Sequence, residues 1–351
     1  MILKRAEAAV RHVLRQLPAE TAHDLALRVL AFAPDLSAVA PDRLRTQLCG
    51  LDLAHPVGLA AGFDKNARIV DGLLCAGFAF VETGTVTPRP QPGNPKPRLF
   101  RLDEDGAIIN RMGFNNDGLE RYCERLSGFR SRTREPRGSV GANIGINKDS
   151  SNPLADYAAG LRKVAPLADY VTINISSPNT PGLRALQAAE ALRPLLERIC
   201  EERIRTTPVL LKIAPDLDGD ELDAITDLAL QYRLDGMIVS NTTISRPSCL
   251  AAPQRQEAGG LSGKPLHDLA LAALRRVAQR TEGRLDLVGV GGISTAADVY
   301  ERIRAGACCI QLYTAFVYHG PFLIRSLLED LDTLLQRDGL SSIREAVGID
   351  L

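Results

Sequence analysis

The chain has 351 residues, of which 45% are hydrophobic and 24% are charged, a balance typical of a globular protein with a sizeable core. Its 42 basic residues equal its 42 acidic residues, so the formal net charge of zero gives no indication of a nucleic-acid partner. The seven cysteines include no CxxC pair and the five histidines are scattered, which argues against a metal site or a disulfide framework.

The first 40 residues predict two helices. Apolar residues recur at helical spacing over residues 2–17, Pro18 ends this helix, and residues 21–32 form a second, short apolar one. The remainder of the first helix is basic, which is typical of a membrane surface, but a helix packed on the following domain explains the pattern equally well. No apolar run approaches the roughly 20 residues of a membrane-spanning helix. Glu7 and the absence of serine before residue 37 lead us to expect no transit peptide, and no secretory signal is expected either.

Eight short apolar segments alternate with helical patterns through the rest of the chain. The predicted strands are 56–60, 78–82, 139–144, 169–175, 208–213, 235–240, 285–290 and 307–312. Predicted helices include 183–203, 219–232, 266–280 and 296–305. This alternation indicates a parallel sheet covered on both faces, and eight units favour an α/β fold of the (β/α)8 TIM-barrel type. An open doubly wound sheet is the alternative.

Polar and glycine residues follow every predicted strand. In a barrel of this type, the carboxyl ends of the strands form one rim, and active sites lie there. The residues at these ends are 61–65, 83–85, Asn143, Asn174 with Ser177, Lys212, 240–242, 289–292, and Tyr313 with Thr314. Any one of them alone is better explained as a turn residue, but eight such ends on one rim indicate a binding site.

Two glycine-rich segments suggest a phosphate site. Residues 289–292 end the seventh strand and lead into a helix that starts near Ser294 or Thr295. Backbone N–H groups in such a turn can bind a phosphate, although a tight turn with a helix cap is the alternative. Residues 259–263 could close over the same phosphate, and a flexible loop explains them equally well. The connection of about 55 residues between strands two and three carries Pro88, Pro90, Pro92, Pro95 and Pro97, and such long, proline-stiffened connections are usually functional.

Two lysines and five asparagines give the rim its expected chemistry. Lys65 and Lys212 follow apolar strands, where a cation needs an anionic partner, although a lysine that extends to solvent is the alternative. The asparagines that suit a planar, amide-rich ring are Asn110, Asn143, Asn174, Asn179 and Asn241. Ser177 has no evident histidine and acid partner, so a hydrolase triad is unsupported. The residues predict a barrel enzyme that binds a phosphate-bearing cofactor and a polar ring, without naming the reaction.

Longer motifs match one enzyme family over residues 1–330. They are 60–65 (AAGFDK), 84–93 (GTVTPRPQPG), 109–116 (INRMGFNN), 174–182 (NISSPNTPG), 212–216 (KIAPD), 241–243 (NTT), 259–263, 289–293 and 313–314. On these residues the chain resembles the dihydroorotate dehydrogenases. The resemblance implies a flavoprotein oxidoreductase that uses FMN to oxidise dihydroorotate to orotate in pyrimidine biosynthesis.

The resemblance also implies roles for individual residues. Those expected to hold FMN are Ala61, Gly62, Phe63, Asp64, Lys65, Thr85, Asn143, Asn174, Lys212, Ser240, Gly263, Gly292, Tyr313 and Thr314. Those expected to hold the substrate are Lys65, Asn110, Arg111, Met112, Gly113, Phe114, Asn174, Asn179, Asn241 and Thr242. Ser177 matches the catalytic base that removes the C5 proton while C6 delivers hydride to the flavin. A threonine or a water could relay that proton, and Thr180 lies close in sequence.

Ser177 also indicates a class, because soluble members of the family have cysteine at this position and quinone-reducing, membrane-associated members have serine. The N-terminal extension is typical of the second class and predicts two domains: a helical quinone-access segment, 1–40, and a catalytic barrel, 41–351. His23 and Arg101 match residues of the quinone site, whereas Val317 departs from relatives that have threonine there. We therefore expect a membrane quinone as partner, no metal and no nucleic acid, and peripheral attachment to the cytoplasmic face of a bacterial inner membrane.

Overall fold

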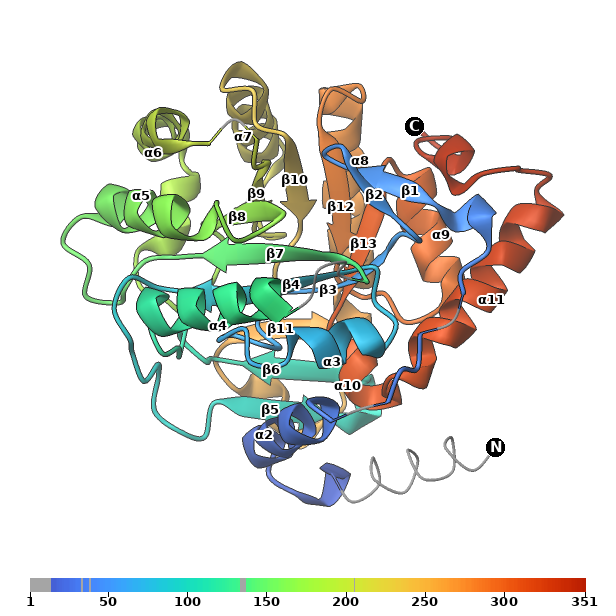
Figure 1. Ribbon diagram of the computed structural model, residues 1–351, viewed down its shortest axis with the longest axis horizontal. Coiled ribbons are helices and arrows are strands. Elements are labelled where there is room, and N and C mark those ends of the chain that lie inside the picture. The colour runs from blue at the N-terminus through green and yellow to red at the C-terminus, as the bar shows by residue number, and fades with distance from the viewer. Residues whose placement is uncertain (1–13, 33, 38, 133–136, 205) are drawn as a thin grey trace.

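The computed structural model describes residues 14–32, 34–37, 39–132, 137–204 and 206–351. Eight parallel strands form a closed barrel, in which each strand pairs with the next along the chain and the last pairs with the first (Figure 1). They are β3 (Val57–Leu59), β4 (Phe80–Val86), β7 (Ser139–Ile144), β8 (Tyr170–Asn174), β9 (Val209–Ile213), β10 (Gly236–Val239), β12 (Asp286–Val290) and β13 (Cys309–Leu312). The predicted (β/α)8 TIM barrel is confirmed, and the open doubly wound sheet is excluded.

Strand β9 illustrates how the sequence positions side chains. Successive side chains of a strand point to opposite faces of the sheet. Val209, Leu211 and Ile213 belong to the main hydrophobic core between barrel and helices, whereas Leu210 belongs to a smaller core inside the barrel. Lys212 shares the alternation of Leu210, so its side chain is directed into the barrel interior, as predicted from its place at a strand end.

Nine helices of six residues or more lie around the described barrel or after its last strand. They are α3 (Val70–Cys75), α4 (Leu119–Arg132), α5 (Pro153–Val164), α6 (Ala189–Glu202), α7 (Gly219–Gln231), α8 (His267–Thr281), α9 (Ala296–Arg304), α10 (Thr314–His319) and α11 (Phe322–Arg337). Capping boxes start two of them, because Asp218 and Thr295 each accept a hydrogen bond from the backbone three residues later. The apolar faces of these helices cover the strands.

Two predicted boundaries were wrong. The single helix predicted over 183–203 is a 3-10 helix, Leu183–Gln187, followed by α6, because Ala188 between them has extended backbone angles. The second strand was predicted to end at residue 82, but β4 continues to Val86 and pairs with β7 as far as Ile144. Residues 83–85 therefore belong to the strand itself rather than to a turn after it.

The amino-terminal end of the barrel is closed by a hairpin, β1 (Thr46–Leu48) and β2 (Leu51–Leu53). The side chains of Leu48 and Leu53 pack with the inner core of the barrel. Thr46 Oγ1 donates a hydrogen bond to the carbonyl of Cys308, just before β13. With this end plugged, only the carboxyl end of the barrel is left to receive a ligand.

The long proline-rich connection builds a second, three-stranded sheet. Strand β6 (Ala107–Asn110) pairs on one side with β5 (Leu99–Leu102) and on the other with β11 (Gly260–Gly263), both antiparallel. The glycine-rich run near residue 260 is therefore an edge strand over part of its length and not a flexible loop. Figure 1 shows this sheet beside the barrel, with α2 (Ala19–Leu30) next to β5.

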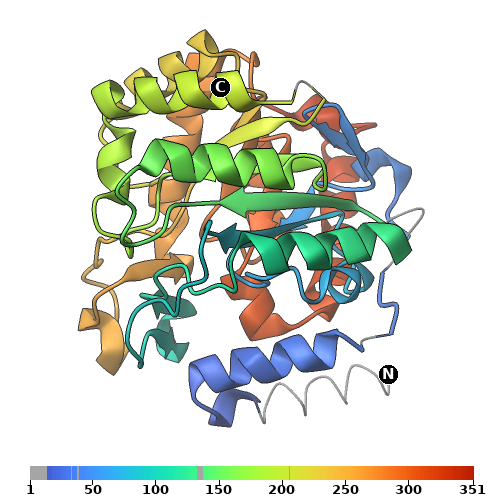
Figure 2. The same cartoon turned by 60° about the vertical axis from the view of Figure 1, so that its left-hand side comes forward.

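The N-terminal extension is described from residue 14 onward. The first predicted helix falls mainly on residues outside the described part, and its last residues, 14–16, are helical. The second predicted helix is α2, which begins two residues earlier than expected and ends at Leu30. In Figure 2, α2 lies at the bottom of the molecule, at the opposite end from the C-terminus of the chain. Within the described residues, none of the helices combines the length and the hydropathy that a membrane span requires.

Candidate active site

A cavity opens at the carboxyl ends of the barrel strands, with about 1110 Å³ of atom-free space including its mouth. Its walls contain residues that belong to or follow every barrel strand except β7. The predicted site residues that line it are Ala61, Gly62, Lys65, Thr85, Asn110, Met112, Gly113, Phe114, Asn174, Ser177, Asn179, Lys212, Ser240, Asn241, Thr242, Gly263, Gly292, Tyr313 and Thr314. The structure thus brings together segments that are far apart in sequence.

The floor of this cavity carries a buried ion pair. Lys212 Nζ lies 3.9 Å from Glu82 Oε1, and both side chains are almost completely removed from water. Burial lowers the pKa of Lys212 because it disfavours the charged form, and the carboxylate of Glu82 opposes that shift. The predicted anion for Lys212 is therefore, within the described residues, this carboxylate from β4.

A network of hydrogen bonds holds Glu82 in place. Its Oε1 accepts from Asn143 Nδ2 at 2.7 Å, and its Oε2 accepts from Gln311 Nε2 at 2.8 Å. Further donors to Oε2 are the hydroxyls of Tyr170 and Thr172. A buried carboxylate with this many donors satisfies the rule that buried charges are paired and hydrogen-bonded.

Asparagine side chains connect that network to the cavity wall. Asn143 Oδ1 accepts from Thr85 Oγ1 at 2.5 Å and from Asn174 Nδ2 at 3.1 Å. Asn174 in turn accepts from the hydroxyl of Ser176 at 2.8 Å. Because each amide is oriented by its neighbours, the polar wall is preorganised before any ligand arrives.

Ser177 lies in the loop that follows β8, and its side chain is buried. Its Oγ accepts a hydrogen bond from the backbone N–H of Asn179 at 3.2 Å, and no described histidine or acid contacts it. Asn179 Nδ2 donates to the carbonyl of Asn110 at 3.1 Å, which ties this loop to strand β6. Thr180 Oγ1 is buried without a hydrogen-bond partner in the described part of the chain.

Lys65 lies on another wall of the cavity. Its Nζ donates to the carbonyl of Gly62 at 2.7 Å. Removal from water lowers its pKa to about 8, and the positive charge of Arg98 acts in the same direction. An anionic ligand would therefore find a cation here that lacks a close carboxylate partner among the described residues.

One end of the cavity has the geometry of an anion cradle. Gly292 and Ile293 line it, and within the described residues their backbone N–H groups donate no hydrogen bond. Gly292 has a φ of +72°, and a Cβ at this position would lie 2.3 Å from the Cα of His267, so only glycine fits. Free N–H groups in such a turn bind phosphate groups.

Arg302 is buried directly behind this cradle. Its Nη2 donates to the carbonyls of Gly291 at 2.9 Å and His267 at 2.8 Å. Its Nε and Nη1 have no hydrogen-bond partner among the described residues. Burial lowers the pKa of this guanidinium to about 10, so it remains charged at neutral pH.

Of the residues predicted to hold FMN or substrate, four do not line this cavity. Asn143 lies beneath it, in the network described above. Asp64 accepts hydrogen bonds from the backbone of Asn66, Arg68 and Ile69, so its carboxylate shapes the loop after β3. Arg111 pairs with Glu257 at 2.6 Å, away from the cavity. Phe63 lies in a second cavity.

That second cavity lies between α2 and the barrel, with about 1550 Å³ of atom-free space including its mouth. Most of its lining is apolar, and it includes the two residues of the predicted quinone site, His23 and Arg101. The His23 ring packs edge-on against the Phe63 ring at a centroid distance of 5.1 Å. Burial lowers the pKa of His23 to about 3, and nearby Lys65 also lowers it, so the ring is neutral at physiological pH.

The two cavities share part of their walls. Leu99, Ile108 and Tyr313 line both of them. Leu99 and Ile108 belong to the three-stranded sheet, so the proline-rich connection forms the partition between the cavities. A molecule in one cavity would therefore lie close to a molecule in the other.

Sequence reasoning missed several residues of the first cavity. Gln311 lines its floor, Glu82 lies beneath the floor against Lys212, and Arg302 supports its anion cradle. The signal for Glu82 was a carboxylate at the end of an apolar strand, which requires a buried partner. Arg302 sits in a helix with an ordinary amphipathic pattern, which gives no such signal. No described cluster of three or more His, Cys, Asp or Glu residues is arranged to hold a metal ion.

The comparisons with known proteins agree on one family. The sequence model of the dihydroorotate dehydrogenases matches residues 43–335. A protein of Novosphingobium aromaticivorans named dihydroorotate dehydrogenase (quinone) is 52% identical over 342 residues, which cover 97% of this chain and 98% of that protein. A protein of Xanthobacter autotrophicus with the same name is 48% identical over 352 residues, with 97% and 98% covered.

A solved structure gives the same result. The crystal structure of DHODH from Eimeria tenella in complex with ferulenol has a TM-score of 0.92 at 40% identity, and the match covers 96% of this chain and 98% of that one. Similarity of this extent in both sequence and backbone is far above what a shared barrel fold alone produces. The chain therefore belongs to the dihydroorotate dehydrogenase family, in its quinone-dependent class.

Proposed function

We propose that this protein oxidises dihydroorotate to orotate, with FMN as hydride acceptor and a membrane quinone as final electron acceptor, in pyrimidine biosynthesis. The observation that carries the proposal is the set of side chains that line the first cavity. A buried serine, two lysines and a set of oriented asparagines face one space, and an anion cradle lies at its end. An apolar cavity shares a wall with it, as a two-substrate redox enzyme requires.

The first cavity suits FMN. The free N–H groups of Gly292 and Ile293 match a terminal phosphate, with the charge of Arg302 behind them. Gln311 lines the cavity, and its Oε1 lacks a donor among the described residues, so a ring N–H could supply one. Lys212 provides a buried positive charge that favours a ligand gaining negative charge. FMN, when bound, supplies the acceptor for the hydride.

The substrate would bind beside it, against Lys65 and the asparagines. Lys65 pairs with the carboxylate of dihydroorotate, and the amides of Asn110, Asn174, Asn179 and Asn241 orient the pyrimidine ring. Ser177 removes the C5 proton while the C6–H bond leaves with its electron pair as hydride, so a C5–C6 double bond forms. A serine hydroxyl is a weak base, so in this proposal a neighbouring group passes the proton on. The Thr180 hydroxyl, which is buried in the same loop without a hydrogen-bond partner among the described residues, is the candidate.

The second cavity would receive the quinone. Its apolar lining suits a prenylated ring, and neutral His23 and cationic Arg101 offer polar contacts for the quinone oxygens. In this proposal residues 1–40 form the quinone-access segment, and residues 41–351 the catalytic domain. Exposed Phe32 and Val39 lie in the N-terminal segment, consistent with peripheral attachment to the cytoplasmic face of a bacterial inner membrane.

The proposal is tested by separating the two half-reactions in stopped flow. Purified protein should carry FMN, dihydroorotate should reduce it, and a ubiquinone should reoxidise it. Ser177→Ala should retain FMN and lose most of the reduction rate, while its reoxidation by ubiquinone stays unchanged. Absence of a yellow cofactor would contradict the flavin assignment, and normal reduction in the Ser177→Ala variant would contradict the role of this serine.

A further inference from the structure

We propose that Arg184 is a positioning residue for the reductive half-reaction. Paired with Asp216, its guanidinium holds the base-bearing loop, residues 176–180, and the substrate-facing segment, residues 241–245, in one fixed arrangement. This inference rests on the proposed function, because it concerns the same site. Neither Arg184 nor Asp216 lines the cavity, so neither is proposed to touch the substrate.

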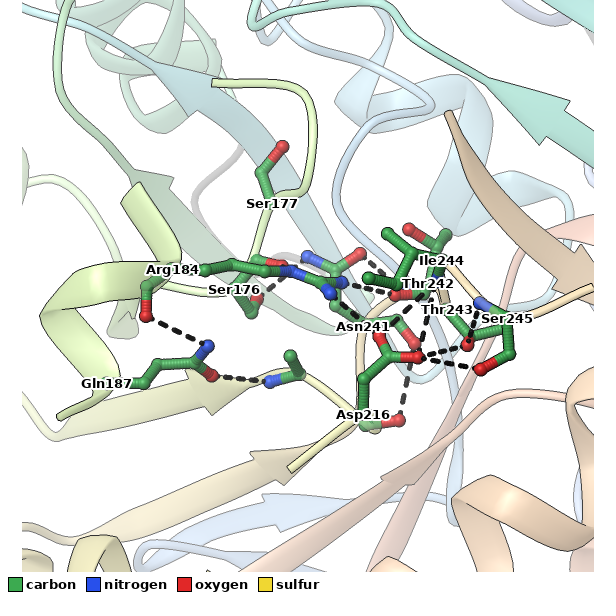
Figure 3. Close-up of polar contacts among 12 residues, drawn as sticks. Ser176, Ser177, Arg184, Gln187, Asp216, Asn241, Thr242, Thr243, Ile244 and Ser245 are labelled. Atoms are coloured by element: carbon green, nitrogen blue, oxygen red, sulfur yellow. Dashed lines mark hydrogen bonds and ion pairs between the residues drawn. The ribbon is translucent and has the colours of Figure 1, made fainter. Parts of the chain in front are cut away.

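The guanidinium of Arg184 makes three contacts in three directions. Its Nε donates to the carbonyl of Ser176 at 3.0 Å, its Nη2 donates to the carbonyl of Thr242 at 2.8 Å, and its Nη1 pairs with Asp216 Oδ2 at 2.7 Å. Figure 3 shows Arg184 extended between these groups, with the Ser177 side chain pointing away from them. A guanidinium carries its donors on three nitrogens in one rigid plane and so reaches three separate segments, whereas an ammonium group offers all its donors from a single atom.

The contact with Ser176 bears directly on the base. Ser176 immediately precedes Ser177, so a fixed Ser176 carbonyl fixes the backbone from which the base projects. The Ser176 hydroxyl also accepts from Asn241 Nδ2 at 2.8 Å. The loop with the base and the segment with Asn241 and Thr242 are therefore joined twice, once through Ser176 and once through Arg184.

Asp216 completes the arrangement from the loop after β9. Its carboxylate accepts hydrogen bonds from the Thr243 hydroxyl, from the backbone N–H of Ile244 at 3.3 Å and from the Ser245 hydroxyl at 3.4 Å. These donors belong to the segment that follows β10, and Figure 3 shows them gathered around Asp216. One carboxylate therefore anchors Arg184 and the residues just after Asn241 and Thr242.

Burial makes this pair more than a surface salt bridge. The side chains of Arg184 and Asp216 are 21% and 14% exposed, so solvent screens them only in part. Gln187 adds a further link, because its Oε1 accepts from the backbone N–H of Ala214 at 2.8 Å, next to the loop of Asp216. The structure thus ties the ends of β8, β9 and β10 together through charged and amide side chains.

Substitution of Arg184 is expected to lower the rate of flavin reduction by dihydroorotate more than the affinity for FMN. A displacement of about 1 Å between reacting groups can lower a rate about 100-fold. In stopped flow, Arg184→Met should lower the rate constant for reduction of bound FMN by dihydroorotate about 10- to 100-fold. Reoxidation of the chemically reduced protein by a short-chain ubiquinone should remain within about twofold of wild type. Arg184→Lys keeps the charge but not the three contacts, so its reduction rate should lie between the two.

A matched control is available at the opposite end of β9. Arg203 pairs with Asp235 at 2.5 Å, and their side chains are 17% and 30% exposed, similar to the Arg184 pair. Asp235 also accepts from the backbone N–H of Val209, so this pair too anchors an end of β9. Arg203→Met should leave both half-reactions unchanged, because it lies at the closed end of the barrel.

Two outcomes would overturn the inference. One is a reduction rate in Arg184→Met, or in Arg184→Lys if the methionine variant does not fold, that equals the wild-type rate. The other is an equal loss in both half-reactions that Arg203→Met reproduces, which would mark a general effect on folding. Failure of dihydroorotate to reduce the wild-type flavin would instead contradict the proposed function, so the two failures are distinguishable.

Discussion

The ammonium group of Lys212 lies 3.9 Å from the carboxylate of Glu82, at the centre of the barrel and beneath the polar cavity. The two residues come from strands on different sides of the barrel, and both point inward. Glu82 is also hydrogen-bonded to Asn143 and Gln311, and through Asn143 to the cavity wall. Lys212, which lines the expected flavin site, is thus held in place by the carboxylate of Glu82, which does not line that site.

Removal of the carboxylate charge should leave Lys212 uncompensated. Breaking a buried ion pair by changing one partner typically costs about 3–5 kcal/mol. Glu82→Gln should therefore lower the free energy of unfolding in urea by roughly this amount. The exposed Glu197, which accepts from the Tyr232 hydroxyl, provides a control, and Glu197→Gln should change stability by less than about 0.5 kcal/mol. Equal stability of the two variants would contradict the importance of the buried pair.

The barrel could be predicted from the sequence because its determinants are local. Short apolar strands, such as 209–213, alternate with amphipathic helices, and each strand end carries polar residues that the fold gathers on one rim. The inward direction of Lys212 was expected from its place after apolar residues at a strand end, and the alternation of side chains along β9 accounts for it.

The partners across the barrel could not be predicted in the same way. No local pattern indicates that Glu82 meets Lys212, or that Arg184 meets Asp216, because each pair depends on which strands face each other after closure. The ion pair between Arg111 and Glu257 likewise joins segments that are far apart in the sequence. The break at Ala188 and the extension of β4 to Val86 depend on tertiary packing that propensities do not contain.

Binding of the anionic product should depend on pH through Lys65. Its pKa is lowered to about 8 by removal from water and by the nearby charge of Arg98. A lysine binds a carboxylate only when protonated, so affinity should be constant well below pH 8 and fall as pH rises through that value. The dissociation constant of orotate, measured from the absorbance change of the bound flavin, should rise up to about tenfold per pH unit above pH 8.

Lys65→Met tests the assignment of that pH dependence. This variant has no titrating ammonium group, so it should bind orotate weakly and without the change near pH 8. A persisting transition of the same size in Lys65→Met would show that another group is responsible.

Arg302 should support binding of the FMN phosphate. Its guanidinium is buried behind the turn of Gly291 and Gly292, and two of its nitrogens have no partner among the described residues. Arg302→Met removes this charge and should weaken FMN binding about tenfold, which corresponds to ~1.4 kcal/mol. Fluorescence titration of the apoprotein provides the measurement.

Riboflavin separates the phosphate effect from a general loss of structure. It lacks the phosphate, so Arg302→Met should leave its affinity unchanged, and Arg302→Lys should restore part of the FMN affinity because it retains the charge. If the methionine variant weakens FMN and riboflavin equally, Arg302 supports only the local fold.

Arg101 should matter for the oxidative half-reaction alone. Its guanidinium donates to the carbonyls of Leu14 at 3.1 Å and Leu17 at 2.5 Å, so it joins β5 to the segment that precedes α2. Arg101→Met removes these contacts from the wall of the apolar cavity, and the rate of reoxidation by a short-chain ubiquinone should fall about tenfold at limiting quinone, a change of ~1.4 kcal/mol. Reduction of the flavin by dihydroorotate should not change, because the cavity of Lys65 and Ser177 is untouched. Arg255→Met is the control, since among the described residues that side chain donates only to its own segment, at 3.4 Å. A loss of both half-reactions in Arg101→Met would contradict a role confined to the second cavity.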